Sequence, residues 1–336
     1  MNNTKKKSPI SWVPTAYFAM GLPFVVLNMV TVLMFKGLEV DDKLITFWTS
    51  LILLPWTLKP LWSPFLELFR TKKFFVIVTQ LITGITFGLV AFALNLSHFF
   101  SISIALLAIV AFSGATHDIA CDGVYMSELS NEDQAKFIGW QGAFYNIAKI
   151  LATGGLVYLA GYFIELNADA GLLTANKRAW MIILLILSVT MILLGIYHLF
   201  ALPSTQSASS RKTLRSNKEV MKELGQVLMD FFRKTHITYY ICFIILYRFA
   251  EGFVMKIVPL FLKADREMGG LGLNEKEIGL YYGTYGAAAF VLGSLLAGYY
   301  IARRGLKKRF SRCAVFLTFL LWCMPCLLTS SRKVVG

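Results

Sequence analysis

Long uninterrupted runs of apolar residues recur along the whole chain, separated by short polar connections. A helix needs about 20 apolar residues to cross a bilayer, whereas strands of a membrane barrel alternate over segments of about ten residues. These runs do not alternate, so they predict membrane-spanning helices. The predicted spans cover approximately residues 12–34, 44–66, 74–94, 99–121, 137–163, 179–202, 237–262, 278–302 and 313–328.

The composition agrees with a protein that crosses the lipid bilayer several times. Of 336 residues, 57% are hydrophobic and 15% are charged, whereas soluble domains carry about 25% charged residues. Six predicted spans precede the longest polar connection and three follow it. We therefore expect an all-α, polytopic membrane protein with about nine transmembrane helices, arranged as six plus three.

The basic residues predict the orientation of these spans. Of the 33 Lys and Arg residues, 20 fall in the N-terminal tail and the even-numbered loops, and nine fall in the odd-numbered loops and the C-terminal tail. Because cytoplasmic loops carry an excess of Lys and Arg, the N-terminus is expected in the cytoplasm. The net charge of +14 is thus mainly a topology signal, and no nucleic-acid partner is expected for residues scattered over short loops.

Residues 203–236 form the longest polar connection. They begin with a serine-rich segment and continue with a charged stretch that is amphipathic over residues 218–232. Transporters built from two six-helix halves carry a cytoplasmic linker at this place. We expect a six-helix bundle at 1–202, the linker at 203–236 and an incomplete bundle of three helices at 237–336. The six-plus-three arrangement leaves two alternatives open: an active nine-helix protein or an inactive, truncated fragment.

Six charged residues lie inside the predicted spans or, in the case of Asp122, directly after one; three are acidic and three are basic. They are Asp118, Asp122, Glu251, Lys59, Lys149 and Arg248. Each would cost about 2.5 to 3.5 kcal/mol at the centre of a bilayer. We therefore expect them to face a shared polar interior, where they can neutralise one another. A seventh charge, Lys256, lies closer to the outer interface.

The two aspartates of the fourth span are four residues apart and therefore share one face of a helix. Two carboxylates so close repel each other, which favours one of them keeping a proton. One interpretation is that Asp118 couples transport to proton movement, with Asp122 or Glu251 assisting. The alternative is that Asp118 pairs with Lys59 or Lys149 and only locks the helices together.

The seventh span carries Arg248 and Glu251, three residues apart. A guanidinium at this depth can bind a carboxylate or phosphate of a substrate through two hydrogen bonds. The alternative is a local ion pair between the two residues. Lys149, near the middle of the fifth span, is a similar candidate for binding an anion.

Prolines, glycines and aromatic residues add three smaller expectations. Prolines should interrupt the first two helices where these line a cavity; they are Pro23, Pro55, Pro60 and Pro64. Glycines of the eighth span should let two backbones approach closely; they are Gly279, Gly283 and Gly286. Aromatic residues near the span ends are expected to anchor the protein at the membrane interface; they are Trp12, Tyr17, Trp48 and Trp180.

Three segments resemble the AmpG-type muropeptide permeases, a branch of the major facilitator superfamily shared with the acetyl-CoA transporters. They are Gly21–Pro23, Leu54–Pro64 and Ser113–Gly123, similar to the family patterns G-L-P, L-P-Y-T-L-K-F-L-W-A-P and S-A-T-Q-D-I-A-x-D. Leu246–Glu251 resembles the family's L-Y-K-L-x-D, and Lys149 stands where a basic residue is usual. His117 replaces the usual Gln.

The resemblance implies a permease that imports anhydromuropeptides by proton symport across a bacterial inner membrane, for peptidoglycan recycling. It implies no cofactor beyond the proton gradient, and a small-molecule substrate bound by Lys59, Lys149 and Arg248. The alternative substrate is another anionic solute, such as an acyl-nucleotide or a sugar acid. The oligomeric state is not predicted.

No enzymatic activity is expected. The sequence contains no His-Glu-x-x-His motif, paired His and Cys metal set or nucleophile motif of the kind that membrane-embedded enzymes need. Cys323 and Cys326 form a C-x-x-C pair inside a leucine-rich span without a second pair, which favours packing over metal binding.

Overall fold

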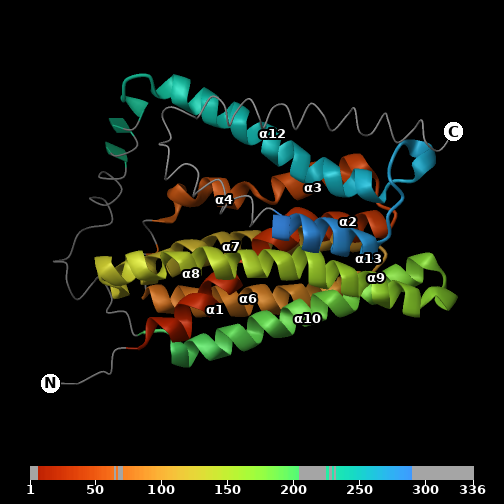
Figure 1. The fold of residues 1–336 in the computed structure, drawn as a ribbon, viewed down its shortest axis with the longest axis horizontal. Helices are drawn as coiled ribbons and strands as arrows, with labels where there is room; N and C mark the ends of the chain where they lie inside the picture. The colour runs from red at the N-terminus through yellow and green to blue at the C-terminus, as the bar shows by residue number, and fades with distance from the viewer. Residues whose placement is uncertain are drawn as a thin grey trace. The chain divides into compact units, whose positions relative to one another are not determined.

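The computed structural model describes residues 7–63, 66, 71–203, 225–226, 229–230 and 232–289, and every regular element in this part is helical (Figure 1). At residues 135, 244–245 and 247–253 only the backbone is described. The chain divides into two units, Met1–Tyr285 and Gly286–Gly336, and the contacts below belong to the first. The all-α fold class is confirmed.

The first span is an irregular helix. It consists of α1 (Pro9–Val25), the π-helical turn η1 (Val26–Val30) and α2 (Thr31–Gly37). Pro23 lies inside α1, and its missing N–H removes one hydrogen bond of the helical ladder just before the wider turn begins. The interruption that the proline predicted is therefore present.

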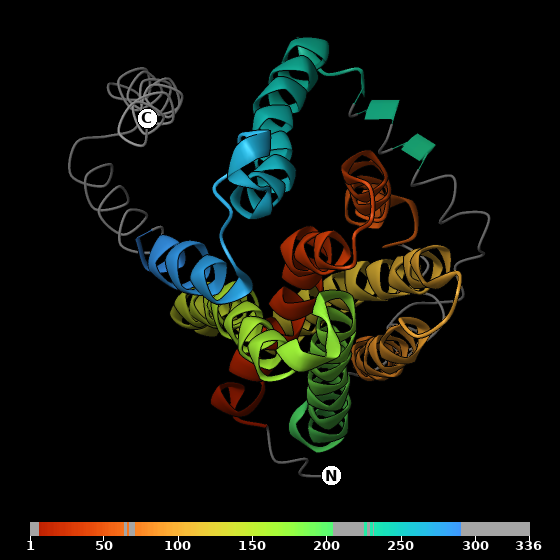
Figure 2. The same ribbon diagram turned by 90° about the vertical axis from the view of Figure 1, so that its right-hand side faces the viewer.

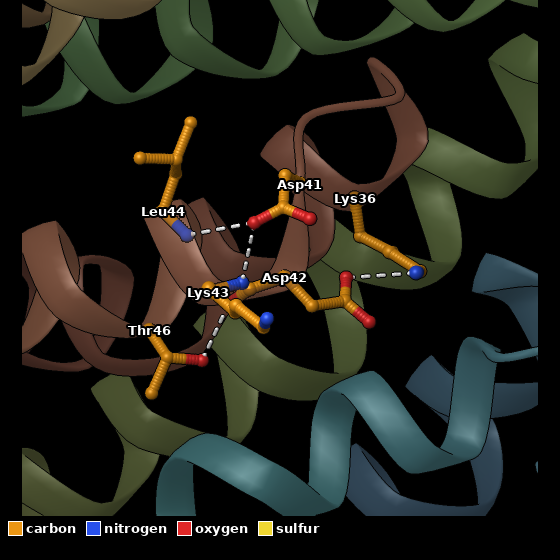
Figure 3. Close-up of polar contacts among 6 residues, drawn as sticks. All are labelled: Lys36, Asp41, Asp42, Lys43, Leu44 and Thr46. Carbon is orange, nitrogen blue, oxygen red and sulfur yellow. Dashed lines mark hydrogen bonds and ion pairs between the residues drawn. The ribbon is translucent and has the colours of Figure 1, made fainter.

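The second span is broken as well, into α3 (Asp42–Leu51), α4 (Leu54–Leu58) and the 3₁₀ turn η2 (Lys59–Leu61). Prolines 55 and 60 lie at the starts of the two short pieces. At the other end, the Asp41 carboxylate caps α3 by accepting hydrogen bonds from the N–H groups of Lys43 (3.0 Å) and Leu44 (3.3 Å). The Nζ atom of Lys36 pairs with Asp42 at 2.7 Å (Figure 3). These contacts fix the turn between the first two spans.

Four more long helices follow. The third and fourth are α6 (Lys72–Ala93) and α7 (Phe99–Glu128). The fifth is continuous over α8 (Asn131–Ile150), the π-helical turn η3 (Leu151–Leu156) and α9 (Val157–Leu166). The sixth is α10 (Leu172–Ala201), which follows the short turn η4 (Ala168–Ala170). α6 packs against both α7 and α10, and α8 packs against α1 (Figures 1 and 2). The described residues contain 6 helices long and apolar enough to cross a membrane, and these match the first six predicted spans.

The later part of the chain contributes α12 (Ile237–Lys263), the turn η6 (Arg266–Met268), α13 (Glu275–Ile278) and η7 (Gly279–Gly286). α12 covers the seventh predicted span but is not among the six apolar helices. Most of the eighth span, the whole ninth span and most of the linker lie outside the described residues. The count of nine helices and the domain boundaries therefore stay predictions.

These later elements contact the first six spans. α12 packs on α2, η1 and α3, and α13 packs on α9. A methyl group on Gly279 would lie 2.5 Å from the backbone nitrogen of Tyr158, and one on Gly283 would collide with the Thr153 carbonyl oxygen. The close backbone approach expected for these two glycines is confirmed.

An ion pair supports the same contact. Lys276, just before η7, binds the Glu165 carboxylate at the end of α9. The hydrogen bond that Lys276 donates to this carboxylate raises the pKa of the lysine above its ordinary value, so the lysine stays charged at neutral pH.

The aromatic residues expected at the membrane interface are mostly buried. Trp12, Tyr17 and Trp180 are exposed by only 1%, 4% and 0%, so the interface interpretation is wrong for these three. Their rings fill space between packed helices, where a large apolar side chain stabilises more than it does at the surface. Trp48, at 36% exposure, is compatible with the expectation.

Candidate functional site

α7 carries the two aspartates into different surroundings. Asp118 is buried, with 8% of its surface exposed, whereas Asp122, one helical turn later, is exposed. They share a face of the helix, as their spacing predicted. One carboxylate is therefore enclosed by protein, whereas its neighbour is not.

Asp118 is held by two donors from the broken second span. The Nζ atom of Lys59 lies 2.6 Å from its Oδ2 atom, and the indole Nε1 of Trp56 donates to the same oxygen at 2.9 Å. The other oxygen, Oδ1, is buried without a hydrogen-bond partner among the described residues. Of the two lysines proposed as partners for Asp118, the structure thus brings Lys59 to it.

Asp122 is held by a chain of hydrogen bonds from two further helices. The Tyr17 hydroxyl of α1 donates to Oδ1 of Asp122 at 2.8 Å, and the side-chain amide of Gln141 in α8 donates to the tyrosine oxygen at 2.7 Å. Tyr17 therefore links the exposed carboxylate to α8. The first, second, fourth and fifth spans all contribute to this pair of aspartates.

Close packing around Trp56 fixes the direction of its indole N–H. A methyl group on Gly114, one turn before Asp118 in α7, would lie 2.8 Å from the Cζ2 atom of Trp56. Phe24 holds the ring from another side, in an edge-on contact with 5.2 Å between centroids. The indole therefore fits only because residue 114 has no side chain.

The first and fifth spans approach each other through a second glycine. A methyl group on Gly21 would lie 3.0 Å from the carbonyl oxygen of Tyr145 and 3.1 Å from Cβ of Ala148. Because Gly21 lies one turn after Tyr17 in α1, this contact fixes the helix that carries the tyrosine.

The remaining predicted site residues are only partly described. Lys149 lies in the last turn of α8 and is half-buried. Arg248 and Glu251 lie on α12, but their side chains fall outside the described residues, and so does the proposed pairing between them. The anion-binding roles of Lys149 and Arg248 and the assisting role of Glu251 stay predictions.

His117 belongs to a separate buried network on another face of α7. Its Nε2 atom lies 3.0 Å from Nε2 of Gln80, whose Oε1 lies 2.8 Å from Nδ1 of His198. The Nε2 atom of His198 in turn lies 2.9 Å from the Thr15 hydroxyl. These polar side chains connect the first, third, fourth and sixth spans and do not contact the two aspartates.

Sequence reasoning missed three residues of the site: Tyr17, Trp56 and Gln141. Trp56 and Gln141 carry a polar N–H group inside an apolar span, which was a usable signal. The sequence signal for Tyr17 was its helical spacing from Gly21, which places both residues on one face of the first helix. In the structure, this face packs against α8. The described residues hold no group of three His, Cys, Asp or Glu that could bind a metal, and the absence of a cofactor stays a prediction.

Comparison with known proteins identifies the family. A family model described as Major Facilitator Superfamily matches residues 15–335. The chain belongs to the major facilitator superfamily. This membership makes it a multi-pass membrane protein of a transporter family, as expected, and not an enzyme.

Among curated relatives, this superfamily member is similar to the anhydromuropeptide permeases of Escherichia coli strains K12 and O157:H7. Each is 23% identical over 299 residues, which cover 87% of this chain and 55% of the relative. The chain thus spans about half the length of the curated relatives it matches.

Two solved structures share the fold of this superfamily member. Both are crystal structures of a bacterial homologue of the human lysosomal transporter Spinster in an inward-facing conformation. The unoccupied form has a TM-score of 0.62 at 14% identity, covering 91% of this chain and 64% of that one. The occupied form has a TM-score of 0.59 at 16% identity, covering 88% and 60%.

Proposed function

We propose that this chain imports anhydromuropeptides across a bacterial inner membrane by proton symport. The observation that carries the proposal is the buried Asp118 carboxylate, which is ion-paired with Lys59 and has one oxygen without a described partner. The similarity to the anhydromuropeptide permeases supports the substrate. We also propose an N-terminus in the cytoplasm from the distribution of Lys and Arg, and the inward proton gradient sets the direction of transport.

Competition for Lys59 gives a mechanism for coupling. While Asp118 is ionised, its charge holds the lysine ammonium at 2.6 Å. A proton on Asp118 removes that charge, so the ammonium becomes available to a carboxylate of the peptide part of the substrate. When the substrate leaves, Lys59 returns and expels the proton. Substrate and proton are thereby bound and released together.

Asp122 and Tyr17 give the proton a second position. Asp122 is exposed and accepts the Tyr17 hydroxyl, and it lies one turn from Asp118 toward the predicted cytoplasmic end. We assign Asp122 the role of receiving the proton after Asp118 releases it. Lys149 and Arg248 are assigned to binding of the anionic substrate together with Lys59, and Glu251 is assigned to assisting Asp118 in proton coupling.

Uptake into proteoliposomes tests the proposal. The chain is reconstituted, an inward proton gradient is imposed, and accumulation of labelled GlcNAc-1,6-anhydroMurNAc peptide is measured. Accumulation that disappears when a protonophore collapses the gradient supports the proposal. Uptake that equals that of protein-free liposomes contradicts it. The variant Asp169→Asn, which changes an exposed carboxylate in η4, is the control and should transport like the parent chain.

Competition in the same assay tests the substrate class. Unlabelled anhydromuropeptide should reduce the labelled uptake at lower concentration than an acyl-nucleotide or a sugar acid does. If one of those anions competes better, the chain is a permease for that solute instead, because Lys59 can bind any carboxylate or phosphate.

A further inference from the structure

Lys256 is a buried cation that neither the proposed binding site nor the proposed proton route uses. It lies on α12 with 5% of its surface exposed. Its Nζ atom donates to three backbone carbonyl oxygens: those of Leu27 at 3.5 Å, Asn28 at 3.2 Å and Thr49 at 3.4 Å. An ammonium group has three N–H donors and no acceptor, so the three oxygens match its bonding capacity.

These carbonyl groups come from the irregular part of the first span and from the last turn of α3. Leu27 and Asn28 lie in the π-helical turn η1. Such turns occur mostly as single bulges inside α-helices and are frequent at functional sites. Each carbonyl oxygen has a second lone pair, so the oxygens of Asn28 and Thr49 can accept a hydrogen bond from a cation as well as from the backbone. The Leu27 oxygen also accepts the Thr31 hydroxyl at 3.0 Å, and its contact with Lys256 is the longest of the three.

The contact joins the two halves of the predicted transporter. Lys256 belongs to the seventh span, whereas its acceptors belong to the first and second. Among the described residues, no carboxylate forms an ion pair with Lys256. An ammonium is costly to bury without a compensating group. Here the three carbonyl groups compensate the burial. The ammonium reaches them only while α12 lies against η1 and α3.

The other lysine of α12 with described partners behaves differently. Lys263, two turns further along the helix, pairs with Glu275, which lies in the same half of the chain. Both charges of that ion pair come from the second half, although α13, which carries Glu275, also packs on α9. The Lys256 contact instead has all its acceptors on the first and second spans.

We propose that the carbonyl oxygens of Leu27, Asn28 and Thr49 form a site for an alkylammonium ion, which the chain fills with Lys256 to hold this end of the transporter closed. Opening this end withdraws the ammonium from the three oxygens. Removal of the side chain leaves an empty site with the same acceptors, which a free primary alkylammonium ion can occupy. The inference rests on the proposed transport function only in that a transporter must open and close.

A thiol-labelling experiment tests the site. The reporter is Leu260→Cys, because Leu260 belongs to α12, is 6% exposed and packs in a core otherwise made mainly of residues from the first six spans. The full chain in nanodiscs is treated with a water-soluble maleimide, and the chain without the added cysteine gives the background. Lys256→Ala should raise the labelling rate about tenfold, the factor expected from loss of a hydrogen bond to a charged group.

Added n-propylammonium supplies the atoms that Lys256→Ala removes beyond Cβ, and it should lower the labelling rate toward that of the parent. Tetramethylammonium carries the same charge without an N–H donor and should not. Lys256→Met, which keeps the side-chain volume, should also label faster and carries the test if the alanine variant does not fold. Lys177→Ala is the matched control, because Lys177 lies over the Phe99 ring at 5.7 Å within the first half, and it should label like the parent.

Three results would overturn the proposal: unchanged labelling in both Lys256 variants, equal acceleration in Lys177→Ala, or no distinction between the two ammonium ions. Labelling needs no substrate. If the parent chain fails to take up anhydromuropeptide while the labelling results hold, the proposed function is wrong and the ammonium site stands.

Discussion

The ammonium of Lys59 lies 2.6 Å from Oδ2 of Asp118, and this ion pair connects the broken second span to the fourth. The side chains are exposed by 27% and 11%, so the carboxylate is almost enclosed while the lysine keeps some access to solvent. The proposed coupling requires that a proton or a competing anion open this ion pair, whereas a contact that only joins helices would stay closed.

Replacement of Lys59 by methionine should destabilise the chain, because it leaves the Asp118 carboxylate buried with only Trp56 as a donor. We expect Lys59→Met to lower the free energy of unfolding by about 1 to 3 kcal/mol, measured by denaturation of the purified protein. Lys59→Met combined with Asp118→Asn should recover part of this loss, since the uncompensated charge is then removed. Strictly additive effects of the two substitutions would show that the pair is not energetically coupled.

A methyl group at residue 114 should disturb the site without changing any of its polar atoms. Gly114→Ala places a carbon 2.8 Å from the Trp56 ring, and overpacking of this kind costs about 1 to 3 kcal/mol. The ring must move, so its N–H leaves Asp118, and uptake should fall. Gly139→Ala in α8, where no atom lies within 4 Å of the added carbon, is the control and should keep full uptake. Equal activity in both variants would contradict the role of Trp56.

The sequence predicted those residues of the site whose charge is costly to bury in a bilayer, and it did not predict the uncharged ones. Asp118 and Lys59 were identifiable because each is costly in a bilayer and each relieves the other. Tyr17 was misplaced at the membrane interface, because its distance from the span end does not show which face of the helix is buried. The contact of Lys256 was not predictable, because its partners are backbone carbonyl groups, which every residue has; two of them belong to the π-helical turn and the third to α3.

Removal of the Tyr17 hydroxyl should affect Asp122 while leaving the Asp118 ion pair in place. Tyr17→Phe deletes the donor to Asp122 and the acceptor for Gln141. We expect a loss of stability of about 1 kcal/mol and slower uptake at an unchanged apparent affinity for substrate. Tyr239→Phe, at a position that is 70% exposed, provides the comparison. A large loss of affinity in Tyr17→Phe would place the hydroxyl at the substrate instead.

The buried network around Gln80 should contribute to stability and not to coupling. Gln80→Leu keeps a similar volume but leaves ring nitrogens of His117 and His198 without their described partner, which costs about 1 to 3 kcal/mol each for groups this deeply buried. Thermal unfolding in detergent should show the loss. The ratio of accumulation with a proton gradient to accumulation without one should stay that of the parent, and a changed ratio would mean that protons use this network.

The most direct test of coupling at Asp118 compares two modes of transport in Asp118→Asn. This variant resembles the protonated residue permanently, so Lys59 stays available to the substrate while no proton can be exchanged. Exchange of internal for external anhydromuropeptide, which needs no net proton movement, should continue at a rate near that of the parent. Accumulation driven by a proton gradient should be lost. If Asp118→Asn still accumulates substrate against its gradient as the parent does, Asp118 does not carry the coupled proton.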